Sequence, residues 1–364
     1  MAREGKPLTY RSAGVDTDSE ALVIADAIRR LGATCVRTPG HGSVKVSNGF
    51  FAAVLDVGGQ GLAISTDGVG TKVLVAQVLG RYDSIGIDCV AMNVNDVLCV
   101  GAEPITLLDY LAVSAIDGDV MRQLMEGLAR GAELAHVAVP GGETAQVPEL
   151  LQPGERNIAF DLVGTCLGTV PLDRVVDGAA IAPGDVVVGL ASSGIHSNGM
   201  TLARRLFRDK GIGYQDRVEA LGRTLGEELL EPTRIYVDAV MGMWRSKIPL
   251  RGLAHITGDG LGNLLRFNQP AVGFIIDRMP QRPAIFAVMQ ELGGISDLEM
   301  FRTFNMGVGF CVVVPEGVAE QAIACAEAVG IPAQRIGYAT GDAAARGRAL
   351  VHCPGGAVVT LDRG

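Results

Sequence analysis

In the first half of the chain, apolar runs with the two-residue period of strands alternate with runs of helical period. The clearest helical run covers residues 84–100; it ends at Gly101 and is followed by Pro104, which are typical stop signals of a helix. In chain order the pattern predicts strands over 50–57 and 62–66, a helix over 84–100, a strand over 105–113, a helix over 119–135, and strands over 137–139 and 158–169. Such an alternation indicates an α/β domain.

A second unit begins after the turn-rich connection at residues 178–185. Its pattern predicts strands over 186–190, 272–276 and 309–314, and helices over 200–208, 232–244, 283–292 and 318–329. We therefore predict two α/β domains of similar size, residues 1–175 and 176–364. A length of 364 residues agrees with this division, because it exceeds what one hydrophobic core usually serves.

The composition narrows the classes of partner. Hydrophobic residues make up 48% of the chain and charged residues 20%, which is typical of a globular protein. The formal net charge of −9 repels nucleic acid and anionic membranes, so neither is an expected partner. A bound phosphate would need local cations, metal ions or backbone N–H groups.

The cysteines and the N-terminus indicate the cellular compartment. The seven cysteines are scattered and form no C-x-x-C pair, which favours reduced thiols over a disulfide framework or a zinc site. Residues 1–10 are polar and lack the apolar core of a signal peptide. We expect a cytoplasmic protein.

The first candidate site is the segment from Ser65 to Lys72, S-T-D-G-V-G-T-K, which follows an apolar strand. Its glycines, Gly68 and Gly70, allow backbone N–H groups to approach phosphate, Lys72 can neutralise it, and Asp67 can hold Mg²⁺. Thr66 and Thr71 add hydroxyl groups. A glycine-rich turn with a solvated lysine explains the same residues equally well.

The second candidate lies in the predicted helix at 84–100. Asp88, Asn95, Asp96 and Cys99 recur at spacings that place them on one helix face among apolar neighbours. A carboxylate on an apolar helix needs a cation or several donors, which suggests a metal. Taken alone, a helix with its acids in solvent is the slightly better interpretation.

Two further segments follow predicted strands. Gly141 and Gly142 precede Glu143 and Thr144 after the strand at 137–139, an arrangement that suits a Mg²⁺–nucleotide site but also an ordinary turn. The string S-S-G-I-H-S-N-G at 192–199 leads into a helix and brings hydroxyls, an amide and an imidazole to its N-terminus, which suits an anion. His196 could also donate a proton there. The alternative is Ser197 as a plain helix cap.

The remaining polar segments, H-I-T-G-D-G at 255–260 and F-R-T-F-N-M-G-V-G at 301–309, are better explained by loop formation and core packing. Taken together, however, all these strings occur in one collinear order from Tyr10 to about Val314. They include Y-x-x-A-G-V-D at 10–16, G-I-D-x-V-A-M-N-V-N-D at 86–96 with G-A-E-P at 101–104, and L-E-P-T-R-I-Y-V at 230–237. In this order and spacing the chain closely resembles the AIR synthetase family.

The resemblance implies an ATP-dependent enzyme that closes the imidazole ring of purines. In that family formylglycinamidine ribonucleotide (FGAM) becomes aminoimidazole ribonucleotide (AIR), with ADP and phosphate as the other products. The implied protein is a homodimer whose N-terminal domains pack strands into a β-barrel-like core and bind ATP between them, with a separate C-terminal α/β domain. The implied cofactors are ATP and Mg²⁺.

Combined with the residues, the resemblance assigns roles. Asp67, Asp96 and Glu143 would hold Mg²⁺, and Lys72 would neutralise the transferring phosphate. Thr66, Gly68, Gly70, Thr71, Asn95 and Thr144 would contact the nucleotide. His196, with Ser193 and Asn198, would bind the substrate phosphate or move a proton. Asp88 could support the metal site or be structural.

Two alternatives belong to other classes of function. One is another ATP-using enzyme of the same superfamily, such as a thiamine-monophosphate kinase, which carries an S-D pair and G-G-D-T where this chain has Asn95-Asp96 and G-G-E-T. The other is a non-catalytic nucleotide-binding protein. The second predicts loss of acidic and lysine positions, yet Asp67, Lys72 and Asp96 are present, so an enzyme is favoured.

Overall fold

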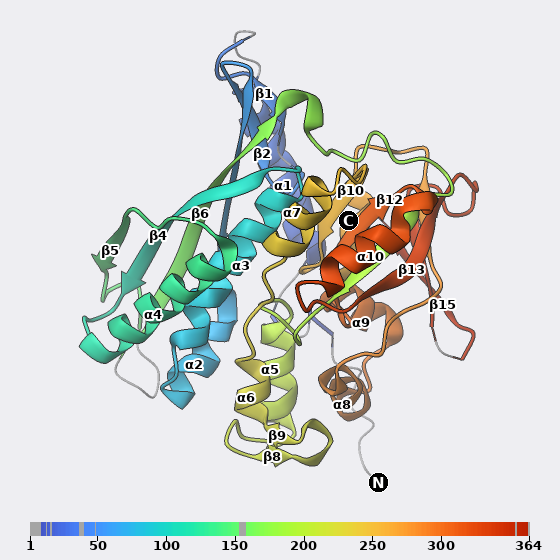
Figure 1. The fold of residues 1–364 in the computed structure, drawn as a ribbon. Coiled ribbons are helices and arrows are strands. Elements are labelled where there is room, and N and C mark those ends of the chain that lie inside the picture. Colours follow the sequence, from blue (N-terminus) through green and yellow to red (C-terminus); the bar gives the residue numbers. More distant parts are fainter. Residues whose placement is uncertain are drawn as a thin grey trace.

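The structure is a computed structural model that describes residues 9–11, 13–14, 17–35, 40–47, 49–152, 158–353 and 355–362. The last two residues of the Y-x-x-A-G-V-D string, Val15 and Asp16, lie outside these ranges. The described chain forms two sheets with helices against them (Figure 1). Within these ranges, no helix combines the length and apolar character needed to cross a membrane.

The first sheet contains six strands. Across the sheet these are β1 (Val44–Val46), β2 (Ala53–Val57), β3 (Gln60–Gly68), β6 (Phe160–Pro171), β4 (Glu103–Val113) and β5 (Gly142–Gln146). Neighbours are antiparallel except β4 and β5, which are parallel. The helices of this half are α1 (Thr17–Gly32), α2 (Val73–Leu79), α3 (Asp83–Leu98) and α4 (Gly118–Ala135).

Helix α3 packs on one face of this sheet, and α4 packs on α3. Two glycines permit the close approach of the helices. A Cβ atom on Gly86 would lie 2.2 Å from the amide nitrogen of Leu128, and one on Gly127 would lie 2.0 Å from the carbonyl oxygen of Asp83. Because no larger residue fits at either crossing point, these glycines set the position of α3 above the strands.

On the opposite, outer face of the sheet, the described part of the chain places no helix. Leu108 and Tyr110 alternate with buried residues on β4 and are 42% and 45% exposed, and Ile105 is 44% exposed. Apolar side chains of this size rarely gather in the open without a partner surface.

The second sheet has the strand order β10 (Gly252–His255), β12 (Val308–Val314), β7 (Val186–Ala191), β13 (Ala333–Thr340), β11 (Gly273–Ile276), β14 (Arg348–His352) and β15 (Val358–Asp362). Its α-helices are α5 (Met200–Asp209), α6 (Leu225–Leu229), α7 (Val237–Arg245), α8 (Ala284–Gly293), α9 (Asp297–Thr303) and α10 (Ala319–Glu327). A small ribbon, β8 (Arg217–Val218) and β9 (Arg223–Thr224), lies beyond α5 and α6. This architecture confirms the α/β class with two sheets predicted from the pattern.

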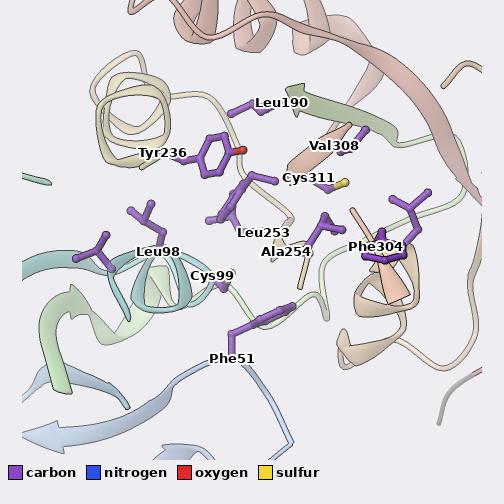
Figure 2. Close-up of a cluster of buried hydrophobic side chains, with 14 of the residues drawn as sticks. Phe51, Leu98, Cys99, Leu190, Tyr236, Leu253, Ala254, Phe304, Val308 and Cys311 are labelled. Carbon is purple, nitrogen blue, oxygen red and sulfur yellow. The ribbon is translucent and has the colours of Figure 1, made fainter. Parts of the chain in front are cut away.

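The two halves share one hydrophobic core (Figure 2). Phe51 and Leu98 from the first half and Leu253 and Cys311 from the second are buried in the same cluster. The predicted boundary at residue 175 falls between the end of β6 and the start of β7. The division into residues 1–175 and 176–364 stays a prediction.

Two local predictions were wrong. The strand expected at 137–139 is only a single bridge between Thr106 and Ala138, and the polar residues after it form strand β5 instead. The helix expected at 232–244 begins at Val237. In both places backbone groups find partners that the hydrophobic pattern does not show: the ladder of β4 for residues 142–146, and side chains of α3 for residues 233–236.

Candidate active site

The candidate site lies where β3 ends, opposite the start of α5. A cavity of about 430 Å³ is lined by Tyr10, Asp67, Gly68, Val69, Gly70, Thr71, Met92, Ser197, Asn198, Gly199, Met200 and Thr201. Both halves of the molecule therefore contribute to it. Of the residues predicted from the sequence, it brings together Asp67, Gly68, Gly70, Thr71 and Asn198.

Asp67 is held firmly at the edge of this cavity. The Asn93 amide accepts a hydrogen bond from the backbone N–H of Asp67 at 2.9 Å and donates one to its carbonyl at 3.1 Å. Asn93 is fully buried on α3. The backbone N–H of Gly68 donates to the Asp67 carboxylate at 2.8 Å. The strand end is thus tied to the helix that carries the second acidic residue.

That second residue is Asp96. Its carboxylate lies 2.9 Å from Nδ1 of His255, a fully buried histidine at the end of β10. Burial and, to a lesser extent, the negative charge of Asp96 raise the pKa of Asp67 to about 6, against the opposing effects of the Gly68 N–H, His255 and Arg266. Two carboxylates whose charges repel at the edge of a cavity are the arrangement that a bound cation stabilises.

Lys72 does not face the cavity. Its ammonium group is fully buried, pairs with the Asp88 carboxylate at 2.8 Å and donates to the Glu231 carbonyl at 2.6 Å. These partners hold the ammonium group away from the residues that line the cavity. The structure gives Lys72 and Asp88 a structural role, and the catalytic role of Lys72 stays a prediction.

Asn95 is likewise structural. It is fully buried, donates to the Arg234 carbonyl at 2.9 Å and accepts from the backbone N–H of Tyr236 at 3.0 Å. The backbone N–H of Thr233 donates to Asp88 at 2.7 Å. Both α3 side chains therefore fix the segment before α7, and the Asn95 side chain is buried away from the residues that line the cavity.

His196 is buried behind the cavity. Its Nε2 accepts from the backbone N–H of Ser193 at 3.2 Å, which places the proton of the neutral ring on Nδ1. Burial lowers the pKa of His196 well below its ordinary value, as do the nearby charges of His255, Lys72 and Arg234. A neutral, buried imidazole is not a phosphate-binding cation, and the predicted role of His196 in substrate binding or proton movement stays a prediction. Ser193 donates to the Pro232 carbonyl at 2.6 Å and does not line the cavity either.

Asn198 fits its predicted role better. It lines the cavity, and its Nδ2 is buried without a hydrogen-bond partner among the described residues. An unsatisfied buried donor costs free energy unless a ligand or water accepts from it. Asn198 is therefore a polar group available to an oxygen-rich ligand.

Glu143, Thr144 and Thr66 lie away from the cavity. In the strand register, Asp67 pairs with Gly164, Gly164 with Asp109, and Asp109 with Gly142. Three strand spacings separate Asp67 from this end of β5, about 14 Å. Glu143 sits opposite Tyr110 on the outer face, whereas Asp67 shares the inner face with Asp109. Within one chain, Glu143 therefore lies apart from Asp67 and Asp96, and its role at a metal ion stays a prediction.

Comparison with known proteins agrees with this geometry. The model of the N-terminal domain of AIR synthase related proteins matches residues 50–170, and the model of the C-terminal domain matches residues 182–349. A phosphoribosylformylglycinamidine cyclo-ligase of Methanothermobacter thermautotrophicus is 47% identical over 315 residues, which cover 86% of this chain and 90% of the relative. The chain belongs to the phosphoribosylformylglycinamidine cyclo-ligase family.

Further similarities support the family and the fold. A cyclo-ligase of Thermococcus kodakarensis is 48% identical, with 87% of this chain and 91% of the relative covered. A hydrogenase maturation protein HypE, solved in complex with ATP, has a TM-score of 0.61 and 20% identity, with coverage of 98% of this chain and 97% of that one. The second similarity shows a shared fold alone.

Two residues near the carboxylates, His255 and Arg266, were not assigned to the site from the sequence. Both act electrostatically on Asp67. They come from different parts of the second half, so neither recurs at a helical or strand spacing with another candidate residue. The described chain contains no ready-made cluster of three metal-binding side chains.

Proposed function

We propose that this protein catalyses the ATP-dependent closure of the imidazole ring, converting FGAM to AIR with release of ADP and phosphate. The observation that carries the proposal is the Asp67–Asp96 pair beside a cavity to which both halves contribute, in a chain 47% identical to a cyclo-ligase. The site has no built nucleophile, and the reaction requires none.

The chemistry follows from a poor leaving group. The formyl amide oxygen of FGAM attacks the γ-phosphorus of ATP, and the bond from that phosphorus to the bridging oxygen of ADP breaks. The amidine nitrogen then attacks the activated carbon, the C–O bond breaks, and the oxygen leaves as part of inorganic phosphate. Loss of a proton from nitrogen completes the ring. Phosphoryl transfer of this kind depends on positioning and charge neutralisation more than on covalent catalysis.

Asp67 and Asp96 are the residues that would hold Mg²⁺. The pKa of Asp67 is raised partly by Asp96, a repulsion that a bound divalent cation would relieve. One or two carboxylates plus substrate phosphates is the ligand set that Mg²⁺ commonly takes. When bound, Mg²⁺ supplies charge neutralisation at the phosphates of ATP. His255 fixes the orientation of the Asp96 carboxylate.

Gly68, Gly70 and Thr71 would position phosphate oxygens along the floor of the cavity. Gly70 has a φ of +69° and open space beside it, so the backbone here can approach a ligand closely. The Thr71 hydroxyl contacts that of Thr201 at 3.0 Å, which links this loop to α5. Asn198 contributes its unsatisfied amide from the other side.

A second protomer is needed for the proposal to place Glu143, Thr144 and Thr66 at a nucleotide. The outer face of the first sheet carries exposed apolar side chains, and β5 leaves a strand edge open. We propose a homodimer that covers this face and brings Glu143 of one protomer to the nucleotide of the other. ATP would then lie between the two N-terminal halves.

The test is to mix the purified protein with Mg²⁺-ATP and FGAM and to measure AIR by diazo coupling and ADP by chromatography. We expect both products in equal amounts, and ADP formation that depends on FGAM. ADP formed with thiamine monophosphate instead, without AIR, would contradict the proposal and assign the protein to the kinase branch.

A further inference from the structure

A second cavity of about 390 Å³ lies beside the candidate active site. It is lined by Ala13, Val78, Thr201, Arg204, Arg205, Arg208, Ile212, Gly213 and Tyr214. Thr201 lines both cavities, so they meet at the first turn of α5. In a chain of net charge −9, three arginines around one cavity concentrate positive charge where an anion can use it.

Arg204 differs from its two neighbours. Arg205 donates to Asp209 at 3.1 Å, and Arg208 lies 3.6 Å from the same carboxylate. Arg204 is half-buried and has no carboxylate partner among the described residues; its Nε donates to the Tyr214 hydroxyl at 3.3 Å. That contact uses one of the five N–H donors of the guanidinium and leaves its outer fork unengaged.

A half-buried guanidinium without an anion carries a desolvation cost that a bound anion offsets. The planar fork of arginine matches the oxygen geometry of a phosphate group, which it can bind through two parallel hydrogen bonds. Tyr214 holds the inner edge of the Arg204 guanidinium, so the fork is oriented before any ligand arrives.

We propose that Arg204, with Arg208 at the rim, binds the 5′-phosphate of the ribonucleotide substrate. The inference rests on the proposed function, because it takes ATP and FGAM as the two ligands and assigns one cavity to the phosphates of each. The phosphates of ATP belong beside Asp67 and Asp96, where a metal ion neutralises them. The phosphate monoester of FGAM, which no metal accompanies, is held by arginine on the far side of Thr201 and directs the ring-forming end toward the first cavity.

The first experiment measures steady-state constants for Arg204→Gln. We expect the KM for FGAM to rise roughly tenfold or more, the loss typical of a hydrogen-bonded charge, while the KM for ATP stays within about twofold. Arg204→Lys keeps a positive charge but loses the planar fork, so we expect its KM for FGAM to lie between those of wild type and Arg204→Gln. Arg130→Gln removes an exposed arginine paired with Glu133 on α4 and is the matched control, with no expected change.

A direct binding measurement separates this inference from the proposed function. Ribose 5-phosphate, titrated calorimetrically into the ATP-free protein, is expected to bind wild type and Arg130→Gln equally and Arg204→Gln roughly tenfold more weakly. This outcome would support the site even if the protein formed no AIR. Equal binding of ribose 5-phosphate to wild type and Arg204→Gln would overturn the inference. So would a rise in the KM for ATP in place of that for FGAM, since it would assign the arginine to the nucleotide.

Discussion

At the scale of single residues, the site depends on the burial of two carboxylates. Asp67 lines the cavity and feels the negative charge of Asp96, and the compensation within the described chain comes from the Gly68 N–H, His255 and Arg266. The protein therefore keeps an unfavourable charge arrangement that a cation would relieve. This is a common feature of binding sites, where stability is lower than the fold could provide.

Replacing Asp67 by Asn tests that arrangement. The pKa of Asp67 is raised from 3.8 to about 6, so the folded state binds a proton more tightly than the unfolded state. The stabilisation from this proton is present below about pH 4 and is lost as the pH rises to 6. In the metal-free, nucleotide-free protein, Asp67→Asn should therefore raise the unfolding temperature at pH 7.5, on the order of 2 °C, with little effect at pH 4.5.

Differential scanning calorimetry at the two pH values measures this, and Asp56→Asn is the control. The pKa of Asp56 is lowered, chiefly by the hydrogen bond from the Gly59 N–H, so its substitution should not stabilise the protein at pH 7.5. Mg²⁺-ATP should stabilise wild type and fail to stabilise Asp67→Asn. An equal change in unfolding temperature at both pH values for Asp67→Asn would contradict a raised pKa for Asp67.

At the scale of elements, α3 connects the two halves through polar side chains. Asp88 and Asn95 form hydrogen bonds with backbone groups of residues 233–236, and Lys72 donates one to the Glu231 carbonyl. The same helix carries Asp96 to the cavity. The acidic and amide residues of α3 thus have two separate tasks, joining the halves and forming the site, on neighbouring positions of one helix.

Lys72→Met should lower stability because it leaves the buried carboxylate of Asp88 without its cation. Breaking a buried pair in this way costs about 3–5 kcal/mol. The double variant Lys72→Met with Asp88→Asn should recover much of that loss, since Asn keeps an acceptor for the Thr233 N–H. Equilibrium unfolding in urea provides the measurement.

Lys45→Met is the matched control, because Lys45 forms an exposed pair with Asp56 at 3.4 Å. Such surface pairs contribute about 0–1 kcal/mol. If Lys72→Met unfolded like wild type but lost turnover, Lys72 would be a catalytic cation after all, and the structural role would be wrong.

Most elements could be predicted from the sequence because their apolar residues recur with a regular period over many positions. The helix expected at 84–100 is α3, and the strand expected at 105–113 ends with β4 at Val113. Helix α2 has only seven residues and β10 four, too short for a periodic signal. Strand β5 is polar and pairs through its backbone alone, which hydrophobicity does not reveal.

The site was predictable in part for a related reason. The cavity loop at 67–71 and Asn198 were found because glycine and polar residues interrupt apolar runs there. Local chemistry could not show that Lys72, Asn95 and His196 are buried in the joint between the halves. Lys72 and Asn95 bind carbonyls more than a hundred residues away, and the charged groups near His196 lie on other elements. The same distance in sequence concealed His255.

At the scale of the whole molecule, a single chain leaves the outer face of the first sheet open. Leu108→Asp places a charge in the centre of that face and should convert the proposed dimer to a monomer in size-exclusion chromatography with light scattering. Val23→Asp on α1, which is 70% exposed, is the control and should stay dimeric. A wild-type monomer would contradict the dimer proposal.

Mixed dimers test whether each nucleotide site uses both protomers. Asp96→Asn and Glu143→Gln should each lose most activity as pure proteins. After subunit exchange, a mixed dimer regains one intact site out of two, because both altered residues can fall in the same site. Half of a random mixture is mixed dimers, so activity should recover to about a quarter of wild type. No recovery, despite exchange shown by mass spectrometry, would contradict a site that combines Asp96 of one protomer with Glu143 of the other.

The most direct test of the account uses FGAM labelled with ¹⁸O in its formyl amide oxygen. Turnover with Mg²⁺-ATP is followed by ³¹P NMR, which resolves labelled from unlabelled phosphate. We expect one ADP and one phosphate for each AIR formed, with the label in the phosphate. Unlabelled phosphate with ¹⁸O in water, or ADP formed without AIR, would contradict activation of the amide oxygen by ATP.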